Sequence, residues 1–206
     1  MHIAVVIVGD EVLNGSCQER NGNTLLAWAR DQGHRVISVT VIGDTVAEIA
    51  RACARARDDG AECLITTGGV GPTMDDRTIE GVATSLGLDD WHEDPTMIAA
   101  LTAWIGSEPQ GVRRRTATVP CGTGIDFPPS SRPGGRGWPV FVVGDTYCLP
   151  GIPRLVDSLL SLLPSGPGPM PHCVITFEGP ETAAAEAVEA LAAQTPWLEL
   201  GSYPPT

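Results

Sequence analysis

The chain has 206 residues, 42% of them hydrophobic, which is enough for one globular domain with a full core and a short appendage. Its formal net charge of −12 argues against a nucleic-acid-binding protein, because such proteins usually carry a basic surface. The sequence has no apolar run of the roughly 18 to 20 residues that span a bilayer, no basic start of a signal peptide and no CxxC pair among its six cysteines. We therefore expect a cytoplasmic protein that keeps its thiols reduced and binds neither nucleic acid nor membranes.

Strand and helix patterns alternate along the first 87 residues. Apolar, β-branched runs at 2–9, 34–43 and 62–67 predict three buried strands. Helical spacing predicts helices at about 20–32, 45–58 and 74–86, the second of them opened by a capping box of Thr45 and Glu48. This βαβαβα order favours an α/β fold in which a parallel sheet is covered by helices on both faces.

The alternation is less regular in the second half of the chain. Five prolines and five glycines at 120–139 predict a long loop or an irregular hairpin. A helix is predicted at 95–106, and two strands joined by a turn at Gly144 and Asp145 are followed by a helix with Pro153 in its first turn. The last part of the chain predicts a strand at 172–179, an Ala-rich helix at 181–194 and a strand at 197–206. We therefore divide the chain into a main domain at 1–163 and a C-terminal strand-helix-strand appendage at 164–206. The appendage could be a truncated form of a longer segment.

Acidic residues follow each of the first three predicted strands. Asp10 and Glu11 follow the first strand, Asp44 follows the second, and Asp75 and Asp76 lie just beyond the third. In open parallel sheets, ligands bind beyond the carboxyl ends of the strands, and all of these carboxylates would lie on that edge. The pattern predicts a functional site there.

A glycine-rich segment, TTGGVGPT at 66–73, lies on the same edge. Gly68, Gly69 and Gly71 would let backbone N–H groups approach a phosphate without interference from a Cβ atom. Thr67 and Thr73 add hydroxyl donors, and a helix from Met74 would direct its N-terminus at the same place. Thr73 fits equally well as a helix N-cap with Asp76 at the third helical position. The spacing is neither a Walker A motif nor GxGxxG.

The acidic residues have two possible roles beside this segment. They could hold a hard divalent cation such as Mg²⁺, which takes oxygen ligands and reconciles carboxylates with phosphate, or one of them could orient or deprotonate a water molecule. Asp10 and Asp44 could also do no more than cap turns or helices.

Three further features carry weaker signals. The LPGIP segment at 149–153 falls on the same edge and could contact a ring or be a plain strand-to-helix turn. Arg113, Arg114 and Arg115 form a basic cluster that we expect to be a solvated surface, and Trp91 and Trp104 are expected in the core.

The motifs GDEVLNG at 9–15, TTGGVGPTMDD at 66–76 and LPGIP at 149–153, in this order, resemble the molybdopterin-binding (MoCF) domain family. Within it, they are similar to the branch of the competence/damage-inducible protein A (CinA) N-terminal domain and to the related domain of FAD synthases. The resemblance implies a three-layer α/β/α sandwich with a mostly parallel sheet, with residues 1–163 as the family domain. Arg113 and Arg115 stand near positions where the family usually has Asn and Lys.

The resemblance also implies roles for individual residues, which are: catalytic acids Asp10, Asp44 and Asp76; metal ligands Asp10, Glu11 and Asp76; a phosphate cradle of Thr67, Gly68, Gly69, Gly71 and Thr73; and Gly151 and Pro153 at the border of a base or pterin.

The function expected from this resemblance is a pyrophosphatase that uses Mg²⁺, Mn²⁺ or Co²⁺ to hydrolyse dinucleotides of the ADP-ribose or FAD type. A first alternative is a protein of molybdenum cofactor biosynthesis that binds or adenylylates molybdopterin. A second alternative is a non-catalytic domain for oligomerisation or regulation. In the first two cases the partner is a phosphorylated small molecule, a dinucleotide or a pterin, and the resemblance implies a homo-oligomer, either dimer or trimer.

Overall fold

The computed structural model describes residues 1–129, 137–176, 179, 181–198 and 200–201, which belong to two compact units, Met1–Met170 and Pro171–Thr206. The first unit contains strands β1 (His2–Val8), β2 (Arg35–Ile42), β3 (Cys63–Thr67), β4 (Trp91–Glu93), β5 (Thr118–Pro120), β6 (Gly124–Asp126), β7 (Val140–Val143) and β8 (Thr146–Leu149). Its helices are α1 (Asp10–Leu13), α2 (Asn21–Gln32), α3 (Val46–Asp58), α4 (Thr78–Leu86), α5 (Pro95–Ile105), α6 (Val112–Arg115), α7 (Pro153–Leu159) and the 3₁₀ turn η1 (Leu160–Leu162).

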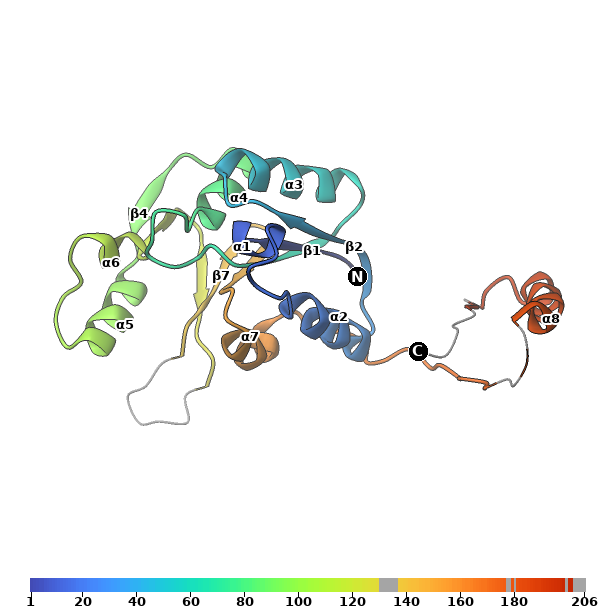
Figure 1. The fold of residues 1–206 in the computed structure, drawn as a ribbon. Coiled ribbons are helices and arrows are strands. Elements are labelled where there is room, and N and C mark those ends of the chain that lie inside the picture. The colour runs from blue at the N-terminus through green and yellow to red at the C-terminus, as the bar shows by residue number, and fades with distance from the viewer. Residues whose placement is uncertain (130–136, 177–178, 180, 199, 202–206) are drawn as a thin grey trace. The chain divides into compact units, whose positions relative to one another are not determined.

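A mixed sheet forms the middle of the first unit (Figure 1). Within the described residues its strand order is β2-β1-β3-β8-β7-β6. The pairs β2–β1, β1–β3 and β3–β8 are parallel, whereas β7 pairs antiparallel with both β8 and β6. The predicted α/β fold with a mostly parallel sheet is therefore confirmed.

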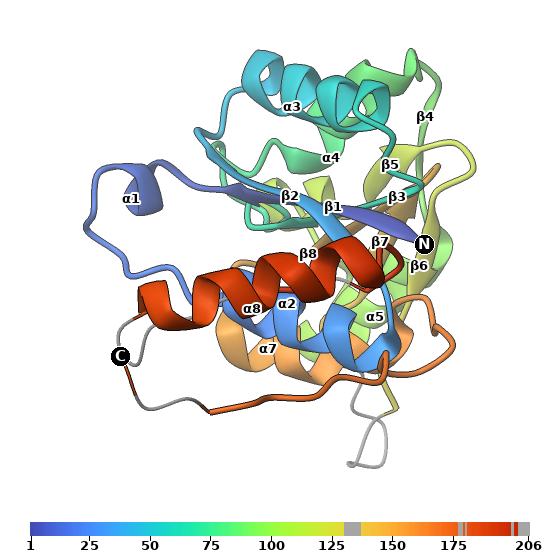
Figure 2. The ribbon, with the colours of Figure 1, turned by 90° about the vertical axis from the view of Figure 1, so that its right-hand side faces the viewer.

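The sheet is covered on both faces, which gives the three layers visible in Figure 2. Side chains of a strand alternate between the two faces, so Ala4, Val6 and Val8 of β1 belong to one hydrophobic cluster with residues of α3 and α4. The intervening residues of β1 belong to a second cluster with residues of α2 and α7. β1 is thus buried on both faces, which explains its continuous apolar sequence.

Helix α4 begins four residues later than the sequence predicts. The Thr73 and Asp76 pair that resembles a helix start instead forms a turn, in which the Asp76 carboxylate accepts hydrogen bonds from the Thr73 N–H and hydroxyl. The first helical N–H, that of Thr78, donates to the carbonyl of Gly69 at 2.9 Å. The prediction for α3 is confirmed, because Thr45 is its N-cap and accepts from the Glu48 N–H at 3.3 Å.

The second unit contains helix α8 (Glu181–Gln194), as predicted. The strand predicted at 172–179 is wrong for residues 172–176, which have no regular secondary structure, and its remaining residues lie partly outside the described range. The strand predicted at 197–206 also falls largely outside that range. Within the described part of the chain, the helices are all too short or too polar to cross a membrane.

An ion pair joins α3 to the hairpin between β7 and β8. The Arg57 guanidinium donates to both carboxylate oxygens of Asp145, at 2.7 and 2.8 Å, and also to the hydroxyls of Ser85 and Thr146. Burial acts to raise the pKa of the Asp145 carboxyl, but the hydrogen bonds from Arg57 and Thr146 outweigh it and hold that pKa below its ordinary value of 3.8. The pair therefore stabilises the fold at neutral pH.

We predict that Arg57→Met lowers the free energy of unfolding by about 2 kcal/mol at pH 7, because it leaves the Asp145 carboxylate without its charged partner. The depressed pKa makes this contribution complete above pH 3.8 and reduces it as the pH falls through the lower folded-state value. Urea unfolding at several pH values measures both effects. Arg55→Met on the same helix is the control, because the Arg55 pair with Asp59 is largely exposed; an equal cost for both variants would contradict the prediction.

Candidate functional site

The carboxyl ends of four parallel strands meet at one edge of the sheet. β1 is followed there by Gly9 and Asp10, β2 by Gly43 and Asp44, β3 by the glycine loop (residues 68–73), and β8 by Pro150 and Gly151. The predicted site residues after these strands are therefore brought to a common edge, as the parallel pairing requires.

Gly68 anchors the glycine loop to the sheet. It has a φ of +102°, and a Cβ at this position would collide with the carbonyl oxygen of Val8 in β1. Its N–H donates to the Leu149 carbonyl at 3.0 Å, and its carbonyl accepts from the Thr78 hydroxyl at 2.7 Å. Because its N–H is already used within the protein, Gly68 shapes the loop and does not present that donor to a ligand, contrary to the expected cradle.

Thr67 has a structural role in place of the expected contact with phosphate. It is 1% exposed, and its hydroxyl donates to the Pro150 carbonyl at 2.9 Å. The Asn21 amide, at the start of α2, donates to the Thr67 hydroxyl at 2.9 Å and to the Gly151 carbonyl at 2.8 Å. This buried network holds the ends of β3 and β8 together beneath the glycine loop.

The loop itself offers backbone donors further along. Within the described residues, no acceptor lies in hydrogen-bond range of the N–H groups of Gly69, Val70 and Gly71. Asp76 holds the far side of the loop, because its carboxylate accepts from the Thr73 N–H at 2.8 Å and from the Thr73 hydroxyl at 2.6 Å. The loop therefore combines a fixed backbone with N–H groups that an anion could use.

The acidic residues form two groups and not one. Burial raises the pKa of the Asp44 carboxyl first, and the charges of Asp10, Asp75 and Glu11 raise it further, so these three carboxylates lie within electrostatic range of Asp44. Asp76 is not among these charges; Thr73 binds both Asp75 and Asp76, but only Asp76 lines the two cavities beside the loop. In the described ranges, no three His, Cys, Asp or Glu side chains are placed to hold a metal ion. The expected metal set of Asp10, Glu11 and Asp76 is therefore not preformed.

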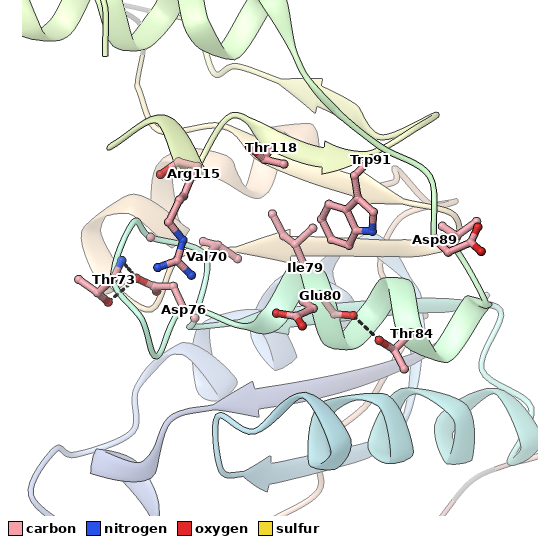
Figure 3. A pocket seen from close by; sticks show the side chains of 14 residues that line it. Val70, Thr73, Asp76, Ile79, Glu80, Thr84, Asp89, Trp91, Arg115 and Thr118 are labelled. Carbon is pink, nitrogen blue, oxygen red and sulfur yellow. Dashed lines mark hydrogen bonds between the residues drawn. The ribbon is translucent and has the colours of Figure 1, made fainter. Parts of the chain in front are cut away.

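The larger of two cavities beside the loop has a volume of about 490 Å³ (Figure 3). Residues 69–71, Thr73 and Asp76 line one end, and Ile79, Glu80 and Thr84 of α4 line its length. The opposite wall comes from the paired strands β4 and β5 and from α6. Figure 3 shows Trp91 and Arg115 directed from that wall into the space over α4.

A smaller cavity, of about 250 Å³, lies against the other part of the loop. Gly69, Val70, Gly71 and Asp76 line both cavities, so the loop is their common wall. The residues that line only the smaller cavity are Pro72, Trp138, Pro150, Gly151, Ile152 and Leu155. Of the expected ring-binding pair, Gly151 is among them, whereas Pro153 is the first residue of α7 and lines neither cavity.

Sequence reasoning missed Trp91 and Arg115. Trp91 was expected in the core but is 37% exposed on β4, where it lines the larger cavity. The basic cluster was expected to be a solvated surface, yet Arg114 donates to Glu93 and Glu108 and Arg115 lines the larger cavity. A cation in a chain of net charge −12 was the available signal for Arg115.

We predict that Asn21→Ala destabilises the protein by about 2 kcal/mol, because it removes both hydrogen bonds that the buried Asn21 amide donates, to the buried Thr67 hydroxyl and to the partly buried Gly151 carbonyl. Asn23→Ala is the matched control, since Asn23 is exposed on the same helix. Thermal unfolding followed by circular dichroism compares the two variants. Equal stability of the two would show that the Thr67 and Gly151 contacts do not hold this edge together.

We predict that Asp44→Asn stabilises the protein at pH 7, by about 0.5 kcal/mol, the scale of interactions between partly exposed charges. The raised pKa means that ionised Asp44 destabilises the folded state above that pKa, whereas below pH 3.8 it is protonated in both states. The gain should therefore disappear at acidic pH. Chemical unfolding measures this gain in stability, and the variant Asp157→Asn, at an exposed position, is the control for a general loss of charge. An Asp44→Asn variant that is less stable than wild type at pH 7 would contradict the prediction.

Comparison with known proteins gives a consistent picture. A family model described as "Probable molybdopterin binding domain" matches residues 4–193. A CinA-like protein of Mycobacterium tuberculosis (strain ATCC 25618 / H37Rv) is 31% identical over 173 residues, which is 76% of this chain and 39% of the relative. A CinA-like protein of Thermotoga neapolitana is 32% identical over 134 residues, or 64% of this chain and 33% of the relative. The chain therefore spans two fifths or less of these relatives.

A solved structure agrees with this result. The crystal structure of CinA from Thermoplasma acidophilum, described as a protein of unknown function, superposes with a TM-score of 0.68 at 26% identity. The match covers 78% of this chain and 94% of that one. The family match spans most of the sequence and the fold agrees with it, so the chain belongs to the molybdopterin binding domain family, within which it is similar to CinA.

Proposed function

We propose that the protein hydrolyses the phosphoanhydride bond of a dinucleotide of the ADP-ribose or FAD type. The observation that carries the proposal is the pair of cavities that share the glycine loop as a wall. A dinucleotide has two ring-bearing halves joined by two phosphates, and this arrangement offers a space for each half with backbone N–H groups between them. The combined volumes fall within the roughly 300 to 1,000 Å³ that is usual for small-molecule sites.

In the proposed reaction, the N–H groups of residues 69–71 hold the diphosphate and stabilise the negative charge that develops on it. Water attacks one phosphorus atom, the bond from that phosphorus to the bridging oxygen breaks, and two phosphate monoesters leave. Asp76 lines both cavities and is fixed by Thr73, so it is the carboxylate positioned to orient the water and accept its proton.

A divalent cation is part of the proposal. Mg²⁺ commonly binds through one or two carboxylates together with substrate phosphates, which does not require a cage made only of protein. No three of the described side chains form a preformed metal site, so one or two of the carboxylates Asp10, Glu11, Asp44 and Asp75 would bind such a cation together with the substrate phosphates. When bound, the cation would neutralise phosphate charge and polarise a P–O bond.

A hydrolysis screen with ADP-ribose and FAD, each with Mg²⁺, Mn²⁺ or Co²⁺, tests the proposal. Mass spectrometry should detect AMP with ribose 5-phosphate from the first substrate, and AMP with FMN from the second. Absence of turnover with every combination would overturn the pyrophosphatase assignment.

We predict that Asp76→Asn lowers kcat by roughly 10²- to 10⁴-fold, because an amide can still accept from Thr73 but cannot take a proton. The loop should therefore keep its shape, and thermal unfolding should change little. Asp89→Asn is the control, since Asp89 lines the distant end of the larger cavity. Full activity in Asp76→Asn would remove Asp76 from the mechanism.

The family description favours a second candidate, a protein that binds or adenylylates molybdopterin. The same loop would then hold the terminal phosphate of the pterin. Calorimetry with ADP-ribose, FAD and molybdopterin separates the two candidates, because only one class should bind tightly. A cytoplasmic location and assembly into a dimer or trimer belong to both candidates as proposals.

A further inference from the structure

We propose that a planar heteroaromatic ring binds on Trp91, in the cleft between α4 and the paired strands β4 and β5, while its phosphates lie on the glycine loop and Arg115. This inference rests on the proposed function only for the presence of a ring-bearing phosphate ligand. The proposed position of the ring differs from the one that the family resemblance implies, which is beside Gly151 and Pro153 on the other side of the loop.

Trp91 is suited to hold a ring. It belongs to the three-residue strand β4, which pairs antiparallel with β5 so that Trp91 lies opposite Pro120, and this pairing fixes its backbone. The indole remains 37% exposed, although burial would be the normal state of so large an apolar group. It lines the larger cavity together with Ile79 of α4, and Figure 3 shows the indole directed towards the Ile79 side of the space. An aromatic face and an aliphatic face across a cleft form a common ring-binding arrangement.

Arg115 occupies the part of the cavity between Trp91 and the loop. Its neighbours on α6 differ: Arg114 is paired with Glu93 and Glu108, whereas Arg113 does not line the cavity. In Figure 3 the Arg115 guanidinium is directed towards the Val70 and Asp76 end of the cavity. Arginine is well suited to bind phosphate, because its planar group can donate two parallel hydrogen bonds.

The order of these groups along the cavity sets the orientation of the ligand. Backbone N–H groups of residues 69–71 come first, Arg115 follows, and the Trp91–Ile79 cleft lies beyond. Two adjacent anion-binding elements followed by an aromatic cleft match a diphosphate whose ring extends away from the loop. The smaller cavity, on the opposite side of the loop, is left for the second half of a dinucleotide.

Calorimetry with α,β-methylene-ADP and with methylenediphosphonate tests the inference, because neither compound can be hydrolysed at its P–C–P bridge and only the first carries a ring. Trp91→Ala should weaken the binding of α,β-methylene-ADP by roughly 5- to 50-fold, the scale of stacking a base on an aromatic side chain. The affinity for methylenediphosphonate should stay unchanged. Trp91→Phe should restore most of the affinity. The quenching of tryptophan fluorescence by α,β-methylene-ADP should be smaller in Trp91→Phe than in wild type.

Two matched controls make the result specific. Ile152→Ala removes an exposed apolar side chain from the smaller cavity and should leave α,β-methylene-ADP binding unchanged. Arg115→Gln should weaken the binding of both compounds, whereas Arg113→Gln on the same helix should weaken the binding of neither. The diphosphate of 6-hydroxymethylpterin, tested in the same variants, identifies whether an adenine or a pterin ring is preferred on Trp91.

The inference would be overturned if wild type bound neither α,β-methylene-ADP nor the pterin diphosphate. It would also be overturned if Ile152→Ala, and not Trp91→Ala, lost affinity for α,β-methylene-ADP, or if Trp91→Ala weakened the binding of methylenediphosphonate to the same extent. Failure of the hydrolysis screen has a different meaning. If the binding pattern holds without turnover of any dinucleotide, the ring subsite stands and the pyrophosphatase assignment falls.

Discussion

The arrangement of the site depends on the close approach of Gly68 to the end of β1. With no Cβ, Gly68 lies against the Val8 carbonyl, and its own N–H and carbonyl bind Leu149 and Thr78. One residue thus joins β1, β3, β8 and α4 at the edge where ligands of parallel sheets bind. Its donor is used up in doing so. The anion-binding capacity of the loop therefore passes to the next N–H groups, those of residues 69–71, whose positions the Gly68 contacts fix.

Periodicity was sufficient to predict the first three parallel strands, because β1 and β3 are continuous apolar runs and helix α3, between β2 and β3, has clear amphipathic spacing. The start of α4 was not predictable. A threonine three residues before an aspartate forms the same short-range hydrogen bonds in a turn as at a helix end, and the contact that decides between them is the bond from Thr78 to Gly69. Trp91 and Arg115 were missed for a related reason: the short β4–β5 pairing that places them has no sequence pattern, and it joins residues 25 to 29 positions apart.

The acidic residues at this edge divide according to whether they line the cavities. Asp75 and Asp76 both accept from the Thr73 hydroxyl, but Asp76 lines both cavities, whereas Asp75 lines neither and is among the charges that raise the pKa of Asp44. The glycine loop therefore has the Asp76 carboxylate in its cavities, and further carboxylates lie outside the cavities, near Asp44. Such a group favours any cation that comes near it, so an anionic ligand accompanied by a cation suits this edge better than a bare anion.

Ligand selection in this fold has to come from the cavity walls and not from the loop. Backbone N–H groups bind phosphate whatever is attached to it, so the glycine loop alone cannot distinguish a dinucleotide from a pterin phosphate. The walls that could distinguish them are built by other segments: α4 with the paired strands β4 and β5 for the larger cavity, and Trp138 with Pro150 to Ile152 and Leu155 for the smaller one. Apart from Pro150 to Ile152, these segments lie outside the motifs on which the family resemblance rests. In the proposed ring subsite, the residue at position 91 therefore carries more information about the ligand of this chain than the glycines do.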